Sequence, residues 1–535
     1  MSQPFALSCQ GGLNVNLNEI ELMGQPGVAT KLVNFEVDPD GGYRRINGFT
    51  PFGGESAARP NSSNSILGLF VYADGVVVCS GTNIYFSEDG TSWLQINRDS
   101  VAGGGDNHTT FTGRSTLART GQGQCQFALF EGANYDYGEL IIADGANELF
   151  FFRMEGTGAL TTRTFFAGEI TVDGTNGVKY ISIHDHHLLA AGVQNNLNTV
   201  YYSVYNDPDN FSGAGAGSIV ISDQIEGIKG FRTDLIVFAQ NSIHKLININ
   251  DSSSIRIDPI TENVGCLSGY SIQEIGGDLL FLAPDGIRTI AGTARIGDVE
   301  LSSVSRSIQK LITDISSSIN SYTISSAVLR NKNQYRLFYS DTSLAASEAQ
   351  GLIGTFTPRG FEWAETKGIQ ATSITSGFNE SGVEDFFHGD HSGYIYNHDT
   401  GNEFNTAGTA SDIQAFYHTP FLDFGDIGTR KTIKYVKISF TPEGTIQPDL
   451  QVKFDFEDTD IPQPPSYTLD SIPSPATFGV TLFGTGVFGA IQNPLTRQTV
   501  EGSGKTISLR IESEDQNAPY SVNGFYIDYM PSGRK

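Results

Sequence analysis

The sequence predicts an all-β protein, in which a β-propeller of six to eight blades follows an N-terminal extended segment and precedes a C-terminal β-sandwich. Seven blades is our count from the sequence. Three observations support this fold class. Short apolar runs are joined by tight turns, a strand-turn-strand unit recurs along the middle of the chain, and the sequence texture changes near both ends.

Tight hairpins are the first of these observations. Apolar runs stop at Asp-Gly and resume directly after it in Ile66–Val78, Glu139–Phe152 and Asp278–Ile290. Asp and Gly tolerate the positive φ angles of two-residue turns, so each stretch predicts two antiparallel strands. Helical spacing of apolar residues is scarce, and Leu301–Ser318 is the best match to a helix.

A repeated unit is the second observation. Each unit has a strand, a turn, an aliphatic strand, a second turn and a further strand. The units begin near Ile66, Cys125, Lys179, Gly227, Ser271, Ser325 and Ile369. A β-meander that repeats every ~40–50 residues is typical of a propeller, because one blade cannot bury both of its faces alone. A pair of β-sandwich domains is the alternative for this region.

The two ends of the chain differ from the repeats. Residues 1–60 are rich in Asn and Gly and predict an extended segment or clasp, and residues 61–405 hold the repeats. Residues 406–535 contain a Pro-rich stretch and strands of regular alternation, such as Lys434–Phe440. This alternation predicts a small antiparallel sandwich.

Composition and charge exclude several classes of protein. Of 535 residues, 39% are hydrophobic and only 17% charged, which is too apolar for a disordered chain. Lys plus Arg number 33 and Asp plus Glu 59, and the net charge of −26 opposes DNA binding across the whole surface. The N-terminus lacks the pattern of a signal peptide, and no apolar run reaches about 18 residues, so we expect no membrane-spanning helix. The four cysteines show no CxxC spacing, and we expect a reducing site of synthesis.

Two histidine clusters are the candidates for a metal site, because imidazoles beside carboxylates are good ligands. The candidate ligands are His184, His186, His388 and His391. The alternative is a pair of strand-turn edges, with His184 and His186 on one strand face. No HExxH, GxSxG or Walker motif is present, so we assign neither a metal nor a cofactor.

Paired carboxylates are frequent, as at Asp455 and Glu457 or at Glu512 and Glu514. On a strand, residues two apart share a face, as glycosidase carboxylates sometimes do, but a catalytic pair must also lie about 5–10 Å apart around a sugar cleft. Such pairs also arise by chance in an acidic chain. We therefore assign no catalytic residue and expect a protein that is not an enzyme.

Two basic pairs stand out in this acidic chain, Arg44-Arg45 and Arg430-Lys431. Each of these four residues is a candidate for docking a partner's carboxylates through charge-assisted hydrogen bonds. Salt bridges within the fold are the alternative for both pairs.

Motifs spread over nearly the whole chain occur in a recognisable order. An opening Gly-Gly-Leu, an Asn-containing strand and an Arg-Arg-x-x-Gly-Phe element lie at Gly11, Gly12, Leu13, Asn34, Arg44, Arg45, Gly48 and Phe49. They are followed by Thr199–Phe211, by Glu262–Ile290, and by the C-terminal stretches FLDFGDIGTRKTIKYVKISF and NGFYIDYMPSGRK. This order resembles the tail nozzle and packaged-DNA stabilisation proteins of short-tailed bacteriophages.

The resemblance implies a non-enzymatic structural protein of the virion tail, assembled in the host cytoplasm. Such propellers assemble as a homo-hexameric ring below tail adaptor proteins, form a nozzle for DNA exit, help to retain packaged DNA, and seat the needle or fibre proteins. Double-stranded DNA would pass without sequence-specific binding. The alternatives are a tail-associated carbohydrate-binding protein or glycan depolymerase, and a secreted propeller adhesin. The missing signal peptide disfavours the adhesin, and a chain with two Trp lacks the expected Trp platforms for glycans.

Overall fold

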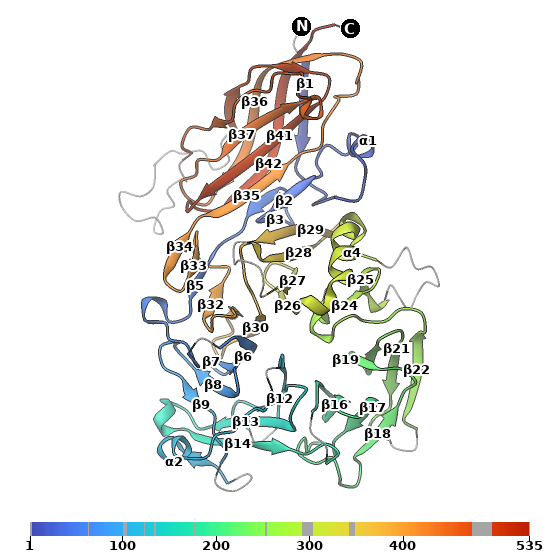
Figure 1. Cartoon of the computed structure of the whole chain (residues 1–535), viewed down its shortest axis with the longest axis vertical. Helices are drawn as coiled ribbons and strands as arrows, with labels where there is room; N and C mark the ends of the chain where they lie inside the picture. Colours follow the sequence, from blue (N-terminus) through green and yellow to red (C-terminus); the bar gives the residue numbers. More distant parts are fainter. Residues whose placement is uncertain are drawn as a thin grey trace.

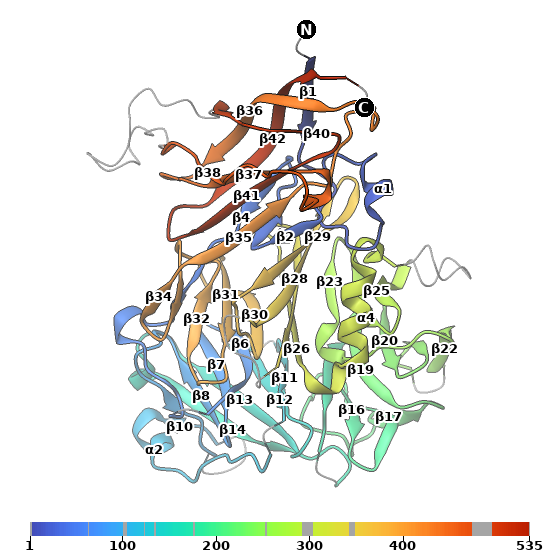
Figure 2. The same ribbon diagram turned by 45° about the horizontal axis from the view of Figure 1, so that its top comes forward.

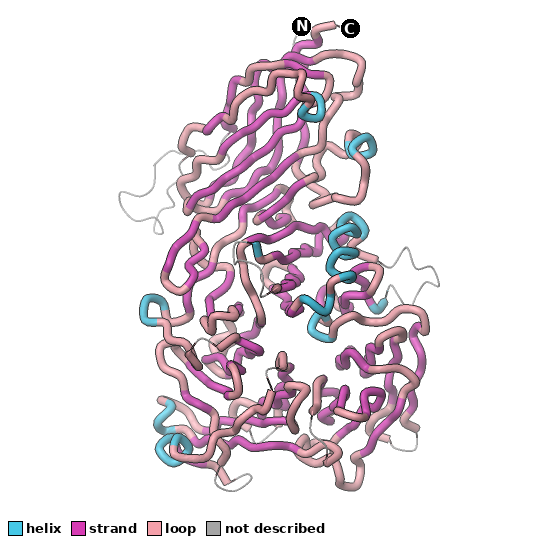
Figure 3. The backbone as a smooth tube through the Cα atoms, viewed as in Figure 1, coloured by secondary structure: helices cyan, strands magenta, loops and turns pink. Residues whose placement is uncertain are grey.

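The computed structural model describes residues 3–62, 64–99, 104–121, 123–132, 135–174, 177–251, 254–291, 303–341, 348–472 and 495–533. Strands dominate these ranges and the helices are few and short (Figure 3). The predicted all-β class is therefore confirmed. Within the same ranges, no helix combines the length and the apolar character needed to cross a membrane.

The propeller is a ring of antiparallel sheets (Figure 1). In chain order, the first four sheets contain β6 (Ile66–Tyr72), β7 (Gly75–Ser80), β8 (Asn83–Ser87) and β9 (Leu94–Gln95); β10 (Asp106–Asn107), β11 (Gln126–Phe130), β12 (Glu139–Ala143), β13 (Leu149–Glu155) and β14 (Thr164–Ile170); β15 (Tyr180–His184), β16 (His187–Val193), β17 (Asn196–Tyr202) and β18 (Gly217–Val220); and β19 (Ile225–Phe231), β20 (Asp234–Ala239), β21 (Ile243–Ile247) and β22 (Arg256–Thr261). A short helix, α2 (His108–Thr112), follows β10.

The remaining sheets complete the ring. They contain β23 (Gln273–Ile275), β24 (Asp278–Ala283) and β25 (Gly286–Thr289); β26 (Thr323–Leu329), β27 (Gln334–Ser340), β28 (Gln350–Thr357) and β29 (Gly360–Lys367); and β30 (Ser373–Phe378), β31 (Glu384–Gly389), β32 (Ile395–His398), β5 (Phe49–Pro51), β33 (Phe404–Thr406) and β34 (Thr409–Ser411). In the described ranges, six sheets lie wholly within the ring, and β26–β29 belong to a longer sheet that runs on into the sandwich. The predicted propeller of six to eight blades is confirmed, and the alternative of two sandwich domains for this region is wrong.

The Asp-Gly hairpins form where they were predicted, but in the first of them the glycine has a different role. Tyr72 pairs with Gly75, so the loop consists of Ala73 and Asp74, and it is Ala73 that has a positive φ of 50°. Gly75 is the first residue of β7, and a Cβ there would lie 2.4 Å from the carbonyl oxygen of Ser87. The glycine is therefore required by the close approach of β8 rather than by the turn.

The single predicted helix is shorter than the sequence suggests. A 3₁₀ turn at Arg306–Ile308 leads into α4 (Gln309–Ser317), which packs against β25 beside the three-stranded sheet. Residues 301–302, at the start of the predicted helix, lie outside the described ranges. Ile312 and Ile315 are buried, which confirms the helical spacing of the apolar residues over this part.

The sandwich is built from both ends of the chain. One sheet contains β1 (Gln3–Ser8), β3 (Phe35–Val37), β4 (Tyr43–Arg45), β36 (Lys431–Pro442), β39 (Leu495–Thr499), β40 (Ser503–Gly504) and β42 (Tyr520–Pro531). The other contains β2 (Lys31–Val33), β35 (Ile413–His418), β37 (Asp449–Phe454), β38 (Tyr467–Thr468) and β41 (Ile507–Asp515). The first 60 residues, predicted as an extended segment, thus supply strands to both sheets of the sandwich and, through β5, to the propeller. They also form a short helix, α1 (Glu19–Leu22).

Strand β2 joins the propeller to the sandwich. It pairs in parallel with β29 and antiparallel with β35, so one sheet continues across the boundary (Figure 2). A single apolar cluster follows the same path, from Leu280 and Ile312 through Trp363 to Val436 and Ile527. Shared strands and a shared core make the propeller and the sandwich one packed body.

Candidate functional site at the junction of propeller and sandwich

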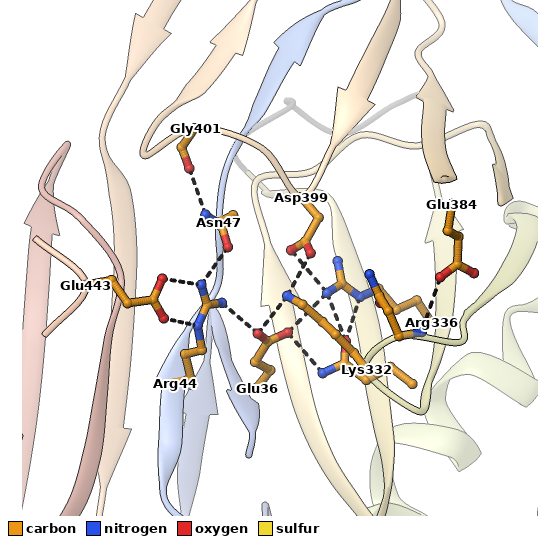
Figure 4. Close-up of polar contacts among 11 residues, drawn as sticks. Glu36, Arg44, Asn47, Lys332, Arg336, Glu384, Asp399, Gly401 and Glu443 are labelled. Atoms are coloured by element: carbon orange, nitrogen blue, oxygen red, sulfur yellow. Dashed lines mark hydrogen bonds and ion pairs between the residues drawn. The ribbon is translucent and has the colours of Figure 1, made fainter. Parts of the chain in front are cut away.

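A carboxylate is buried where the N-terminal segment passes between the propeller and the sandwich. Glu36 lies on β3, between two core residues, and its side chain is 3% exposed. Its Oε1 accepts hydrogen bonds from Arg44 Nη1 at 2.7 Å and from Lys332 Nζ at 2.9 Å. Its Oε2 accepts from Gln334 Nε2 at 3.0 Å and from Arg336 Nη2 at 3.1 Å (Figure 4). Both oxygens are therefore fully engaged.

A second carboxylate and a third extend the network in opposite directions. Asp399, which follows β32 in the propeller, pairs with Lys332 at 2.7 Å and with Arg336 at 3.3 Å. On the sandwich side, Glu443 accepts hydrogen bonds from Arg44 Nε at 2.5 Å and from Arg44 Nη2 at 2.8 Å. The network thus has three cations and three carboxylates, and it connects two propeller sheets, the N-terminal segment and the sandwich (Figure 4).

The pKa values follow from this arrangement. Burial alone would raise the pKa of Glu36, but the charges of Lys332, Arg336 and Arg44 outweigh it and hold the pKa below its ordinary value. Arg336 and Lys332 likewise lower the pKa of Asp399 against the effect of its burial. These carboxylates stay ionised near neutral pH and are not suited to proton transfer. We call the six charged residues the junction network; its role in the chain is to hold elements in place.

Arg45 makes a separate set of contacts within the fold. Its side chain is 1% exposed and pairs with Asp515 at 2.9 Å. The guanidinium also donates to the carbonyl oxygens of Asn517 and Asp515, at 2.7 and 2.5 Å. Arg44 and Arg45, both proposed from the sequence as docking residues, therefore form ion pairs inside the chain, and Arg45 is not accessible to a partner.

The two residues of the second basic pair, Arg430 and Lys431, differ in their exposure. Lys431 is buried, and its ammonium donates to the carbonyl oxygens of Asp426 at 2.5 Å and Lys505 at 2.8 Å. Arg430 is exposed, and its guanidinium donates only to Ser503 in the described residues, at 2.8 and 3.1 Å. Of the four candidates, Arg430 is the one whose charge remains open to a partner.

Arg430 borders a cavity of about 710 Å³ on the sandwich. Its lining includes Ile427 and Phe456, which are 54% and 41% exposed. Phe456 sits at the centre of three successive residues with positive φ, from Asp455 to Glu457. Such a left-handed turn costs energy for residues with a Cβ, and here it holds an aromatic side chain at the surface. The predicted carboxylate pair of Asp455 and Glu457 lies in this turn and not on a strand face.

The first histidine cluster forms a hairpin turn. His184 ends β15, His187 begins β16, and the two-residue loop between them has φ of 51° at Asp185 and 62° at His186. The prediction that His184 and His186 share a strand face is therefore wrong, because His186 lies in the loop. His187 Nδ1 lies 2.6 Å from the Ser203 carbonyl oxygen.

The second cluster lies in the core of a blade. His388 and His398 are buried with their Nδ1 atoms 2.9 Å apart, so one ring donates to the other. Burial lowers the pKa of His388 to about 3. His391 lies beyond β31, outside this pair. Within the described residues, no three His, Cys, Asp or Glu side chains come together as metal ligands.

The junction residues Glu36, Lys332, Arg336 and Asp399 were not found from the sequence. Glu36 lies 296 residues from Lys332 and 300 from Arg336, and no local pattern links them. The one available signal was a lone carboxylate in the apolar strand Phe35–Val37. A charged residue between two apolar residues of a buried strand predicts a buried ion pair.

No protein-family model matches the sequence, and a search of curated proteins finds no match. Among solved structures, the WD40 domain of Pan2 from Neurospora crassa is similar over 62% of this chain and 88% of that one, with 7% identity and a TM-score of 0.34. That likeness is too distant to bear on function. The fold and the junction network define the class: an all-β protein in which a β-propeller and a β-sandwich form one body.

Proposed function

We propose that this chain is a non-enzymatic structural subunit of a ring-shaped tail nozzle in a short-tailed bacteriophage. Its homo-hexameric ring would continue the DNA channel below the tail adaptor proteins, help to retain packaged DNA, seat the needle or fibre proteins and guide genome ejection. It would be assembled in the host cytoplasm and reside in the virion tail. The ordered motifs described above support this proposal.

The structural observation that best supports it is the junction network. A ring under internal pressure needs subunits that do not bend between their parts. Here strand β2 and one apolar cluster belong to both the propeller and the sandwich. The six charged residues of the junction network also form ion pairs across the boundary. A rigid subunit of this kind suits the head-to-tail contacts that repeat around a cyclic assembly.

The centre of the propeller is not a route for DNA in this proposal. The cavity at the hub has a volume of about 160 Å³, far too small for a duplex. DNA would pass through a lumen formed by several copies of the chain. A net charge of −26 would repel the phosphate backbone there and let DNA slide without being held.

Arg430 is the proposed docking residue. It stays exposed beside a cavity that has two partly exposed apolar side chains, and a partner carboxylate would form a charge-assisted pair with it. Replacing Arg430 by Gln should weaken assembly with the partner while leaving the fold of the chain intact.

Electron microscopy of the purified chain in negative stain tests the proposal. We expect closed rings with a stain-filled centre and, in class averages, six-fold symmetry. Particles with the size and shape of a single chain at every concentration would contradict it. Lysates of infected cells should then be imaged to compare tails that carry the density of this ring with tails that lack it.

One surface keeps the carbohydrate-binding alternative open. Tyr205 is 50% exposed and lies beside His186 and His187, with ring centroids 5.3 and 5.7 Å away. An exposed aromatic ring among polar groups can stack on a sugar. Turnover of host-surface glycans by the purified chain, lost in Tyr205→Ala, would favour this alternative; no binding and no turnover would exclude it.

A further inference from the structure

A small polar cavity lies at the hub of the propeller. Residues of the inner strands β6, β11, β15, β19, β23, β26 and β30, or directly beside them, line it. Its volume of about 160 Å³ has room for roughly five waters. Only a small ligand could occupy it.

Lys229, on β19, is the one charged residue in the described lining of this cavity. Among the described residues, no carboxylate lies within ion-pair distance of its ammonium, and no hydrogen bond of that group is found. Burial lowers its pKa, Glu274 offsets part of this effect, and Arg330 adds to it. A cation without a counter-ion in a confined polar space is costly, and a bound anion would remove that cost.

Two neutral donors in the lining are also free. Gln126 uses its Oε1 to accept from the Ile181 N–H at 3.1 Å, which leaves its NH₂ group without a partner in the described residues. Ser373, on β30, lines the same cavity, and its hydroxyl has no partner there either.

Other polar groups around the cavity are already engaged. Gln273 Nε2 donates to the Ser326 carbonyl oxygen at 2.9 Å, and the Tyr270 hydroxyl donates to the Gln124 carbonyl oxygen at 2.8 Å. The Ser325 hydroxyl accepts from the Ile374 N–H at 2.9 Å. Lys229, Gln126 and Ser373 together offer an ammonium, an amide and a hydroxyl from three different blades.

We infer that the hub binds a small oxyanion, of phosphate or carboxylate type, between Lys229, Gln126 and Ser373. Oxyanions accept charge-assisted hydrogen bonds from ammonium groups and ordinary ones from amides and hydroxyls. Because the three donors come from β19, β11 and β30, the bound anion links blades across the hub and stabilises the closed ring. This inference does not depend on the proposed nozzle function.

Thermal unfolding in increasing phosphate, acetate or chloride at matched ionic strength tests the site. The wild type should show a saturable rise in melting temperature with phosphate or acetate beyond that with chloride. Whichever of the two acts at lower concentration identifies the anion type. Lys229→Gln should weaken the apparent affinity by about tenfold or more.

The matched control is Lys245→Gln. Lys245 lies on β21 of the same blade, away from the hub lining, and its replacement removes the same charge. It should respond to the anion as the wild type does. No saturable effect in the wild type, or an equal effect in Lys229→Gln, would overturn the inference.

A measurement on the wild type guards against misfolding of the variant. Reductive methylation followed by mass spectrometry reports the reactivity of each lysine. Phosphate or acetate should slow the modification of Lys229 by about threefold or more and leave Lys245 unchanged. An unchanged rate at Lys229 would overturn the inference. Ser373→Ala, which changes little in the fold, should weaken the protection.

Discussion

Replacing Glu36 by Gln should destabilise the whole chain, because the change leaves cations of the junction network without their central counter-charge. The carboxylate accepts four hydrogen bonds, three of them from Arg44, Lys332 and Arg336, and its side chain is 3% exposed. Gln retains one acceptor oxygen and turns an NH₂ group toward a cation. Breaking a buried ion pair from one side costs about 3–5 kcal/mol, and we expect a loss of that size.

The lowered pKa of Glu36 predicts how the stability difference between wild type and Glu36→Gln changes with pH. The pKa of Glu36 is lowered in the folded chain from an ordinary value of 4.5. A lowered carboxyl pKa contributes stability that is present above the ordinary value and is lost as the pH falls through the folded pKa. The stability difference between wild type and Glu36→Gln should therefore be complete at pH 7 and should shrink below pH 4.5.

Urea unfolding followed by tryptophan fluorescence provides the assay. Trp363, in β29, is fully buried in the cluster that spans the boundary, and Trp93 packs in the first blade, so a Trp93→Phe background isolates the signal near the junction. The control is Glu169→Gln, which breaks the exposed pair with Arg98 and should cost less than about 1 kcal/mol. If Glu36→Gln costs no more than this control, the reasoning about the junction is refuted.

Three further predictions concern the core, a close approach between two strands, and the surface. Because burial lowers the pKa of His388 to about 3, the free energy of unfolding of the wild type in urea should fall as the pH drops from 6.5 toward 3, by up to ~1.4 kcal/mol per pH unit, and this slope should be reduced in His388→Asn; equal slopes would contradict it. Gly75→Ala should lower stability by about 1–3 kcal/mol, because the new Cβ would lie 2.4 Å from a backbone oxygen, whereas Gly24→Ala, with no atom nearer than 3.6 Å, should be nearly neutral; similar calorimetric melting temperatures would contradict this. In a gel-shift assay at low salt, the purified chain should leave duplex DNA unshifted because of its net charge of −26, and a shift that salt abolishes would count against the charge argument.

The sequence was informative wherever the structure is local. Strand pairs and their turns depend on residues within a few positions of one another, and the hairpin of Ile66–Tyr72 and Gly75–Ser80 forms as predicted. The turn at Asp185 and His186 was missed because strand alternation was extended at least two residues past His184, where β15 ends. Asp tolerates a positive φ, which could have signalled the turn.

Long-range arrangement was not available from the sequence. Arg44 and Arg45 were noticed as rare basic residues, but their partners Glu443 and Asp515 lie 399 and 470 residues away along the chain. The insertion of β2 between β29 and β35 depends on pairing across similar distances. Lys229 went unnoticed because the sequence alone does not show that the inner strands leave it without a carboxylate.

The mass of the native assembly tests the central proposal most directly. Native mass spectrometry of the purified chain at near-neutral pH, over a range of concentrations and with tail proteins added, should show a species of six times 57.8 kDa. The same species should be recovered from purified phage particles. A chain that remains at 57.8 kDa under all these conditions, and that is absent from particles, would contradict the account.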